Sequence, residues 1–230
     1  MWREIVELSR PKNVVLAAIT VPLGAHLALS GVWTIQALGL VALQTTSAIC
    51  FMAAGNTFND ISDISIDKVS KSYRPIPSER ISIESAYKVA YSFTLLSSLF
   101  MAAGAYYTEE PYPLIAIWTF AALLMYTYDA GPQTKRLGLI GNIAISLMVG
   151  AVIVYGAASV SLAETEIVIY AAIVAFFANL AREIIKDCED MESDEGRKTL
   201  PMRIGLMNAR SVAYVFILAS MVTLGLAHYI

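Results

Sequence analysis

Long apolar runs separated by short polar segments dominate the pattern along the chain. A helix that crosses a membrane requires about 20 apolar residues, and seven segments come close to that length. They lie at residues 13–30, 35–58, 82–105, 112–128, 138–158, 165–181 and 211–229. The pattern therefore predicts an all-α, polytopic transmembrane helical bundle with seven spans.

Composition supports a membrane protein rather than a soluble one. Hydrophobic residues make up 57% of the 230 residues and charged residues only 15%, whereas ordinary soluble domains contain about 45–50% apolar residues. In lipid, backbone polar groups must bond within their own element, which helices achieve. Membrane lipids, and no nucleic acid, are therefore the expected surroundings.

Lysines and arginines are confined to alternate connections between the predicted spans. They lie before the first span and at the connections after the second, fourth and sixth: Arg3, Arg10, Lys12, Lys68, Lys71, Arg74, Arg80, Lys88, Lys135, Arg136, Arg182, Lys186, Arg197, Lys198, Arg203 and Arg210. Cytoplasmic loops are enriched in Lys and Arg. This alternation predicts a multi-pass protein of the cell membrane, with its N-terminus and basic loops on the cytoplasmic side.

Acidic residues gather at the cytoplasmic ends of two predicted spans. Positions i, i+4, i+7 and i+11 of an α-helix stay within a narrow arc. One set with this spacing follows the second span and another follows the sixth: Asn56, Asp60, Asp63 and Asp67, then Glu183, Asp187, Asp190 and Asp194. The spacing therefore predicts two acidic helix faces.

The two acidic faces belong to similar stretches of sequence. Each runs into a basic loop that contains proline, DKVSKSYRPIPSERIS in one case and DEGRKTLPMRIG in the other. The offset from Asp60 to Asp187 is 127 residues. The chain therefore resembles two pseudo-repeated halves, which is a common plan in membrane proteins.

Carboxylates on one helix face repel each other unless a cation lies between them. Mg²⁺ takes hard oxygen ligands and usually binds one or two carboxylates together with substrate phosphates. Two opposing acidic faces can thus hold metal ions that clamp a diphosphate, while nearby Lys and Arg take the remaining phosphate charge. The alternative is that the acids solvate helix ends and complement loop lysines. Their duplication on one side of the membrane favours function.

The first acidic face has the pattern N-D-x-x-D-x-x-x-D from Asn59 to Asp67, followed by RPIPSERIS and later by REIIKDCEDMESD and TLP. Between residue 9 and about residue 205 the chain resembles the UbiA-type intramembrane prenyltransferases. The resemblance implies an all-α fold, an active site opening at the cytoplasmic side, and Mg²⁺ that binds a prenyl diphosphate. Family members usually have nine spans. We expect one prenyltransferase domain over 1–230, in which either the C-terminal part of the family pattern is absent or the resemblance ends.

The resemblance also implies roles for individual residues. Metal binding and catalysis would fall on Asp60, Asp63, Asp67, Asp187, Asp190 and Asp194. Asn56 and Asn59 would be supporting ligands, and the cations expected to bind the diphosphate are Lys68, Arg74, Lys135 and Lys198. Tyr128, in YDAGPQTKR, resembles the tyrosine of the family's Tyr-to-Lys loop and would be catalytic, because its aromatic face can stabilise the passing carbocation. Ordinary packing or a place in the interfacial aromatic belt is its alternative role. Arg10, beside Pro11, is expected to face either an acceptor phosphate or the lipid surface.

Within the family, AREIIKDCED is most similar to the branch that attaches a second geranylgeranyl chain to the glycerol hydroxyl of geranylgeranylglyceryl phosphate in archaeal lipid synthesis. The function implied is Mg²⁺-dependent transfer of a prenyl group, geranylgeranyl from its diphosphate, to that hydroxyl. The diphosphate would leave as an allylic carbocation forms in a dry, preorganised site. Prenylation of an aromatic quinone precursor such as 4-hydroxybenzoate is the alternative.

Two other classes of membrane protein carry clustered carboxylates. A cation transporter would use them to bind its ion, but transporter sites usually lie near mid-membrane on broken helices, whereas these acids all lie at one face. CDP-alcohol phosphotransferases resemble D-G-x-x-A-R followed by G-x-x-x-D-x-x-x-D in one continuous segment. No such segment occurs in this chain, so the prenyltransferase interpretation is favoured.

Overall fold

The computed structural model describes residues 2–162, 165–191 and 198–227, and within these ranges the chain is helical without a strand. Its elements are α1 (Trp2–Ser9), α2 (Pro11–Ala28), α3 (Ile35–Ser62), α4 (Ile64–Ser70), α5 (Ile83–Tyr107), α6 (Pro111–Met125), the π-helical turn η1 (Tyr126–Ala130), the 3₁₀ turn η2 (Thr134–Leu137), α7 (Leu139–Ala158), α8 (Thr165–Glu189), α9 (Leu200–Ile204) and α10 (Leu206–Leu226). The all-α class predicted from the hydrophobic pattern is confirmed.

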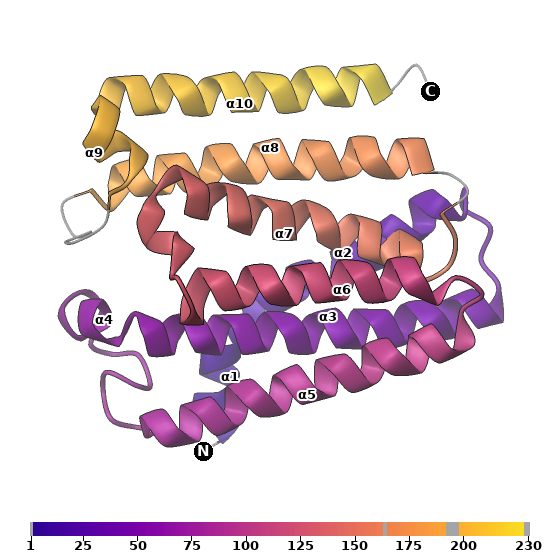
Figure 1. Ribbon diagram of the computed structural model, residues 1–230, viewed down its shortest axis with the longest axis horizontal. Coiled ribbons are helices and arrows are strands. Elements are labelled where there is room, and N and C mark those ends of the chain that lie inside the picture. The colour runs from indigo at the N-terminus through magenta and orange to yellow at the C-terminus, as the bar shows by residue number, and fades with distance from the viewer. Residues whose placement is uncertain (1, 163–164, 192–197, 228–230) are drawn as a thin grey trace.

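Seven long helices, α2, α3, α5, α6, α7, α8 and α10, run roughly parallel or antiparallel to one another (Figure 1). Each of them overlaps one of the seven predicted spans. Among the described residues, α3, α5, α7, α8 and α10 are long and apolar enough to cross a membrane. The shorter α2 and α6, of 18 and 15 residues, complete the bundle.

The two helices that carry the acidic faces extend beyond the predicted ends of their spans. The hydrophobic run of α3 stops near residue 58 and that of α8 near residue 181, but the helices continue to Ser62 and Glu189. Side chains three and four residues apart on a helix can bond to each other, as Glu183 and Lys186 do on α8. The acidic residues therefore begin on the last turns of rigid helices rather than in loops.

Close contact between α2 and α7 fixes the position of α2 in the bundle. A Cβ atom added to Gly24 would lie 2.0 Å from the carbonyl oxygen of Ile153, and one added to Gly156 would lie 2.1 Å from that of Val21. Small residues let helix backbones approach closely in membranes. Because α2 is held in this way, its first residues are brought against the end of α3.

A buried polar network links α3, α5, α6 and α7 away from the acidic ends. The Tyr155 hydroxyl donates to Gln44 and lies 3.1 Å from Ser47 Oγ. Ser47 donates to the Ser97 carbonyl oxygen at 2.8 Å, and Trp118 Nε1 donates to Ser97 Oγ at 2.9 Å. Polar groups in an apolar interior are costly unless bonded. These bonds therefore fix the register of four helices.

Candidate functional site

The first acidic cluster consists of Asn56, Asn59, Asp60, Asp63 and Asp67. It begins on the last turns of α3 and continues into α4, with Asp63 between the two helices. Asp60 and Asp67 are buried, with 3% and 2% of their surface exposed, and Asp63 is half-buried. Buried carboxylates require compensating partners, and the structure supplies them from other parts of the chain.

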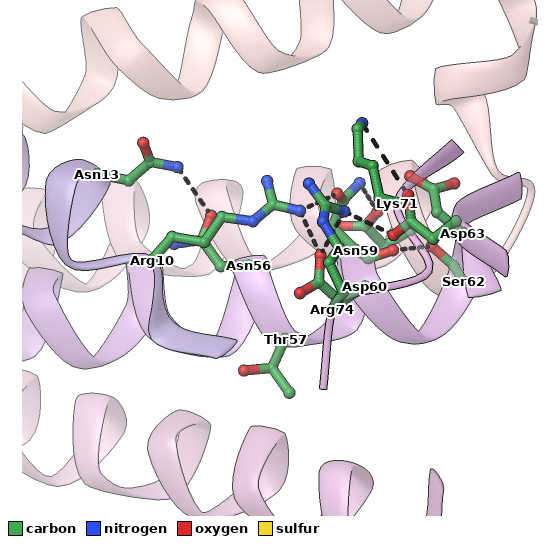
Figure 2. A network of polar contacts seen from close by, with 12 residues as sticks. Arg10, Asn13, Asn56, Thr57, Asn59, Asp60, Ser62, Asp63, Lys71 and Arg74 are labelled. Atoms are coloured by element: carbon green, nitrogen blue, oxygen red, sulfur yellow. Dashed lines mark hydrogen bonds and ion pairs between the residues drawn. The ribbon is translucent and has the colours of Figure 1, made fainter. Parts of the chain in front are cut away.

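Two arginines bind Asp60, one that precedes it in the chain and one that follows it (Figure 2). Arg10 Nη2 donates to Asp60 Oδ1 and, at 3.0 Å, to Asn59 Oδ1. Arg74 Nη1 donates to Asp60 Oδ1 at 3.1 Å and to Asp67 Oδ2 at 2.6 Å. Arg74 thus joins two carboxylates that are seven residues apart.

Arg10 reaches the cluster because of the sharp break between α1 and α2. It precedes Pro11 and has the left-handed conformation φ 51°, ψ 76°, which is uncommon for a residue with a side chain and is often found at functional sites. Asn13 Nδ2 donates to Asn56 Oδ1 at 3.2 Å, and Asn56 Nδ2 donates to the Ser9 carbonyl oxygen at 2.7 Å. These bonds hold the break against α3.

Arg74 is positioned by the tightly turned loop RPIPSER. Ile76 is buried and packs in an apolar cluster with Leu8 of α1 and Ile61 of α3. Arg80, at the end of the loop, binds both carboxylate oxygens of Glu7 at 2.8 and 2.9 Å. The hydrogen bond from Arg80 holds the pKa of Glu7 below its usual value. The loop is thereby anchored to α1.

Lys135 brings a third cation to the cluster from η2. It is buried, with 6% of its surface exposed. Its Nζ lies 2.8 Å from Asp63 Oδ1 and 3.1 Å from Asp129 Oδ1, and it also donates to Ser62 Oγ. Asn59 Nδ2 donates to the same Asp129 oxygen at 3.2 Å. The connection between α6 and α7 is thus bound to the end of α3.

Four carboxylates at the first cluster, those of Asp60, Asp63, Asp67 and Asp129, therefore face four basic groups, those of Arg10, Lys71, Arg74 and Lys135. Removal of one partner from a buried ion pair typically costs about 3–5 kcal/mol, because the other charge is left without compensation. In the described part of the chain, no three acidic, His or Cys side chains converge as metal ligands. The carboxylates are instead paired with basic groups.

The second acidic cluster consists of Glu183, Asp187 and Asp190 at the end of α8; Asp194 lies outside the described residues. Asp187 Oδ2 accepts a hydrogen bond from Asn142 Nδ2 on α7 at 2.8 Å. Glu183 is paired with two cations of its own helix, Arg182 and Lys186, the latter at 3.7 Å. Asp187 is thereby turned toward α7 rather than toward lipid.

A backbone contact connects the segment after the second cluster to the loop that serves the first. Gly138, between η2 and α7, has φ +62°, and a Cβ atom there would lie 2.3 Å from the Lys198 carbonyl oxygen. The Lys198 N–H donates to the Arg136 carbonyl oxygen at 3.4 Å. The neighbouring elements α4 and α9 lie at the same end of the bundle (Figure 1). Both clusters therefore flank the α6–α7 connection.

The structure places the expected cations in different surroundings. Arg74 and Lys135 bind carboxylates of the first cluster, as does Arg10, which was expected to face a phosphate or lipid. Lys68 and Lys198 are exposed side chains, and Lys71, which was not among the expected cations, lies 4.0 Å from Asp67 Oδ1. Their phosphate-binding roles, like those of the aspartates, stay predictions.

Besides Lys71 and Ser62, sequence reasoning missed three polar residues of the described site. Asp129 and Asn13 bind members of the first cluster, and Asn142 binds Asp187. Each lies at the end of a predicted span that carries the basic residues, which is the one signal that could have indicated them. Tyr128, one residue before Asp129, is half-buried in η1, so its predicted role as a cation-stabilising residue stays open.

The geometry can be set beside known protein sequences. The sequence model of the UbiA prenyltransferase family matches residues 9–230. A digeranylgeranylglyceryl phosphate synthase of Pyrococcus abyssi is 35% identical over 223 residues, which cover 96% of this chain and 76% of that protein. The enzyme of the same name from Methanobrevibacter smithii is 36% identical over 208 residues, or 87% of this chain and 69% of that protein. The resemblance inferred from the motifs is confirmed.

Solved structures with a similar fold support the architecture. A structure of a digeranylgeranylglyceryl phosphate synthase has a TM-score of 0.78 and 26% identity, and the match covers 99% of this chain and 77% of that one. A UbiA homologue from Archaeoglobus fulgidus, bound to GPP and Mg²⁺, has a TM-score of 0.77 and 22% identity, with 97% and 77% covered. The chain therefore shares their all-α fold.

Proposed function

The chain belongs to the UbiA prenyltransferase family, and from this premise we propose that it transfers a geranylgeranyl group from geranylgeranyl diphosphate to the glycerol hydroxyl of geranylgeranylglyceryl phosphate. The relatives with this activity in their names support the proposal, because they are 33–36% identical to the chain over most of its length. The phrase AREIIKDCED, already similar to that branch of the family, supports it as well.

One observation carries the proposal, namely the array of basic groups on the carboxylates of the first cluster. Asp60 accepts bonds from two guanidinium groups that come from different parts of the chain, and Lys135 bridges to Asp63. A diphosphate and metal ions need both kinds of charge at one place. The array contains them, already balanced and largely buried.

The residues present suit Mg²⁺. The donors are carboxylate and amide oxygens, which are the ligands that a hard divalent cation prefers, and positive groups already lie on these oxygens. We propose that the metal is held by Asp60, Asp63 and Asp67 and by Asp187, Asp190 and Asp194. Bound there, Mg²⁺ would neutralise the diphosphate and make it a better leaving group.

The side chains of the protein then perform an exchange of partners. Arg10 and Arg74 leave the carboxylates of the first cluster, Lys135 leaves Asp63, and all three bind the phosphate oxygens. The C–O bond between the allylic carbon and the diphosphate breaks, and the acceptor hydroxyl oxygen forms a new C–O bond to that carbon. The hydroxyl proton passes to the departing diphosphate or to an aspartate of the clusters. Because water would quench the carbocation, the helical bundle must keep it out.

The chain is a multi-pass membrane protein, and we propose that its site faces the cytoplasm. The elements α4 and α9 lie at one end of the bundle (Figure 1), and Arg74 and Lys135 bind carboxylates of the first cluster, which continues into α4. An excess of Lys and Arg is typical of the cytoplasmic side. A soluble prenyl diphosphate headgroup would reach the site from there.

The identity of the acceptor is tested by a comparison of two acceptor substrates. Purified protein is incubated with Mg²⁺, geranylgeranyl diphosphate and either geranylgeranylglyceryl phosphate or 4-hydroxybenzoate, and the lipid products are measured by mass spectrometry. The expected product is an ether lipid with two geranylgeranyl chains. Transfer to the benzoate alone would overturn the lipid acceptor while leaving prenyl transfer intact, whereas no transfer to either would overturn the reaction.

A further inference from the structure

Asp129 belongs to neither aspartate motif, yet it is among the most buried carboxylates of the site. Asp129 is 5% exposed and lies in η1, the π-helical turn at the end of α6. Such turns are rare and are frequent at functional sites. Here the turn directs the Asp129 side chain toward the end of α3, where its Oδ1 accepts bonds from Lys135 Nζ at 3.1 Å and from Asn59 Nδ2 at 3.2 Å.

Lys135 is shared between two carboxylates, of which one belongs to the proposed metal-binding motif and the other does not. Asp63 belongs to the metal-binding motif of the proposed function, and its Oδ1 lies 2.8 Å from Lys135 Nζ. If Asp63 binds a metal ion, it no longer compensates this ammonium group. Asp129 is then the carboxylate that still holds Lys135, because it lies outside the motif.

We infer that Asp129 is a positioning residue, which keeps Lys135 beside the first cluster when Asp63 turns to the metal and so presents the ammonium group to the diphosphate. The inference rests on the proposed function. It assigns to Asp129 no contact with the substrate, since its effect passes through Lys135. The bond from Asn59 fixes the Asp129 carboxylate in place for this purpose.

A substitution that removes only the charge separates this role from simple packing. In Asp129→Asn, Lys135 has Asp63 as its one remaining carboxylate partner among the contacts described. The ammonium group then competes more strongly with a metal ion for Asp63. Removal of a group that orients a metal ligand or its neighbour typically lowers metal affinity about 10–100-fold, so the metal concentration at half-saturation is expected to rise about tenfold.

The test measures Mn²⁺ binding by electron paramagnetic resonance, with inorganic pyrophosphate present, on the detergent-purified full chain. Asp129→Asn is expected to raise the half-saturating Mn²⁺ concentration about tenfold, and Asp129→Glu to restore most of the affinity. In a Lys135→Gln background the Asp129→Asn change is expected to have no further effect. Glu109→Gln removes an exposed acid in the distant α5–α6 connection and serves as the matched control.

Three results would overturn the inference while leaving the proposed function standing. The first is an unchanged Mn²⁺ dependence in Asp129→Asn, and the second is an equal loss of affinity in the Lys135→Gln background. The third is that Asp129→Asn and Asp129→Ser both fail to fold while Lys135→Gln folds, because Asp129 would then be a structural residue only. Failure of the wild-type protein to bind Mn²⁺ with pyrophosphate would instead remove the proposed function, and the inference with it.

Discussion

The first and second acidic clusters share one spacing along the helix but differ in what compensates their charge. The first is bound by cations from three separate places, namely the start of α2, the loop after α4 and η2. In the second, Asp187 accepts a bond from an amide, Asn142, and Glu183 is paired with Arg182 and Lys186 of its own helix. Among the described contacts, the repeated spacing is thus not accompanied by repeated partners.

Because of this difference in the described partners, the two clusters would bind a metal ion at different free-energy cost. In the proposed function, the cations from distant parts of the chain would leave Asp60, Asp63 and Asp67 as the metal binds, and they would then bind the phosphates. At the second cluster, the amide of Asn142 can stay on Asp187, because one carboxylate oxygen can accept a hydrogen bond while the other binds metal. With the contacts described, the proposed exchange would therefore couple metal binding to diphosphate binding at the first cluster.

The largest effect is expected when one carboxylate of each cluster is neutralised. Asp60→Asn and Asp190→Asn are each expected to reduce turnover at least about a hundredfold, because metal charge supplies several kcal/mol to the transition state. Asp60→Asn should also lower the Tm more than Asp190→Asn, since it leaves Arg10 and Arg74 without their shared partner. Product formation and thermal unfolding are the measurements. Near-normal turnover in both folded variants would contradict the metal role.

The next effect compares a long-range cation with a local one. Arg74→Gln is expected to raise the KM for the prenyl diphosphate about tenfold or more, since a charge-assisted bond to phosphate is lost. Arg182, whose side chain is 68% exposed in its pair with Glu183, should contribute less than about 1 kcal/mol to stability. Steady-state kinetics and Tm values of Arg74→Gln and Arg182→Gln provide the comparison. An equal KM in Arg74→Gln and the wild type would contradict the phosphate role of Arg74.

A smaller effect is expected at the amide that serves the second cluster. Asn142→Leu keeps the size of the side chain but removes the donor to Asp187, so the Mg²⁺ concentration for half-maximal activity is expected to rise about tenfold. Asn208→Ala, which changes an exposed residue of α10, is the control. If Asn142→Leu and Asn208→Ala had the same Mg²⁺ dependence, Asn142 would have no part in metal binding.

The smallest effect is expected at the surface pair that anchors the RPIPSER loop. The Arg80 hydrogen bond lowers the pKa of Glu7, so the pair stabilises the fold above the unfolded-state pKa of Glu7, and the contribution is lost as the pH falls through the lower folded-state pKa. Arg80→Gln should therefore lower the Tm slightly at neutral pH and not in strong acid. A Tm difference that persists in acid would show that the guanidinium acts through packing instead.

The hydrophobic pattern was sufficient to predict the helical class and the seven long helices. The acidic spacing predicted one continuous helix face from Asn56 to Asp67, which the structure divides between α3 and α4 at Asp63. A run of about 20 apolar residues is a property of each segment alone, and the spacing of Asp60, Asp63 and Asp67 along the sequence is likewise local. The two helices continue past the ends of the predicted spans to Ser62 and Glu189, because hydrophobicity falls before helical structure does.

The partners of the site could not be predicted, because they depend on how distant elements pack. Asp129 and Asn142 reach the clusters only through the π-helical turn and the packing of α7 against α8. Lys68 and Lys71 follow Asp67 by one and four residues, and of these two lysines the structure pairs Lys71 with Asp67, one helical turn further on. Arg10 depends on a left-handed backbone conformation that no pattern of apolar residues indicates.

The exchange of cations for metal at the first cluster is tested most directly by a crystal structure with Mn²⁺ and a non-hydrolysable geranylgeranyl diphosphate analogue. Anomalous scattering from Mn²⁺ should give peaks beside Asp60, Asp63 and Asp67 and beside Asp187 and Asp190. The guanidinium groups of Arg10 and Arg74 and the ammonium group of Lys135 should bind the phosphate oxygens. Peaks absent from both clusters, with the three cations still on the carboxylates while the analogue is bound elsewhere, would contradict the exchange.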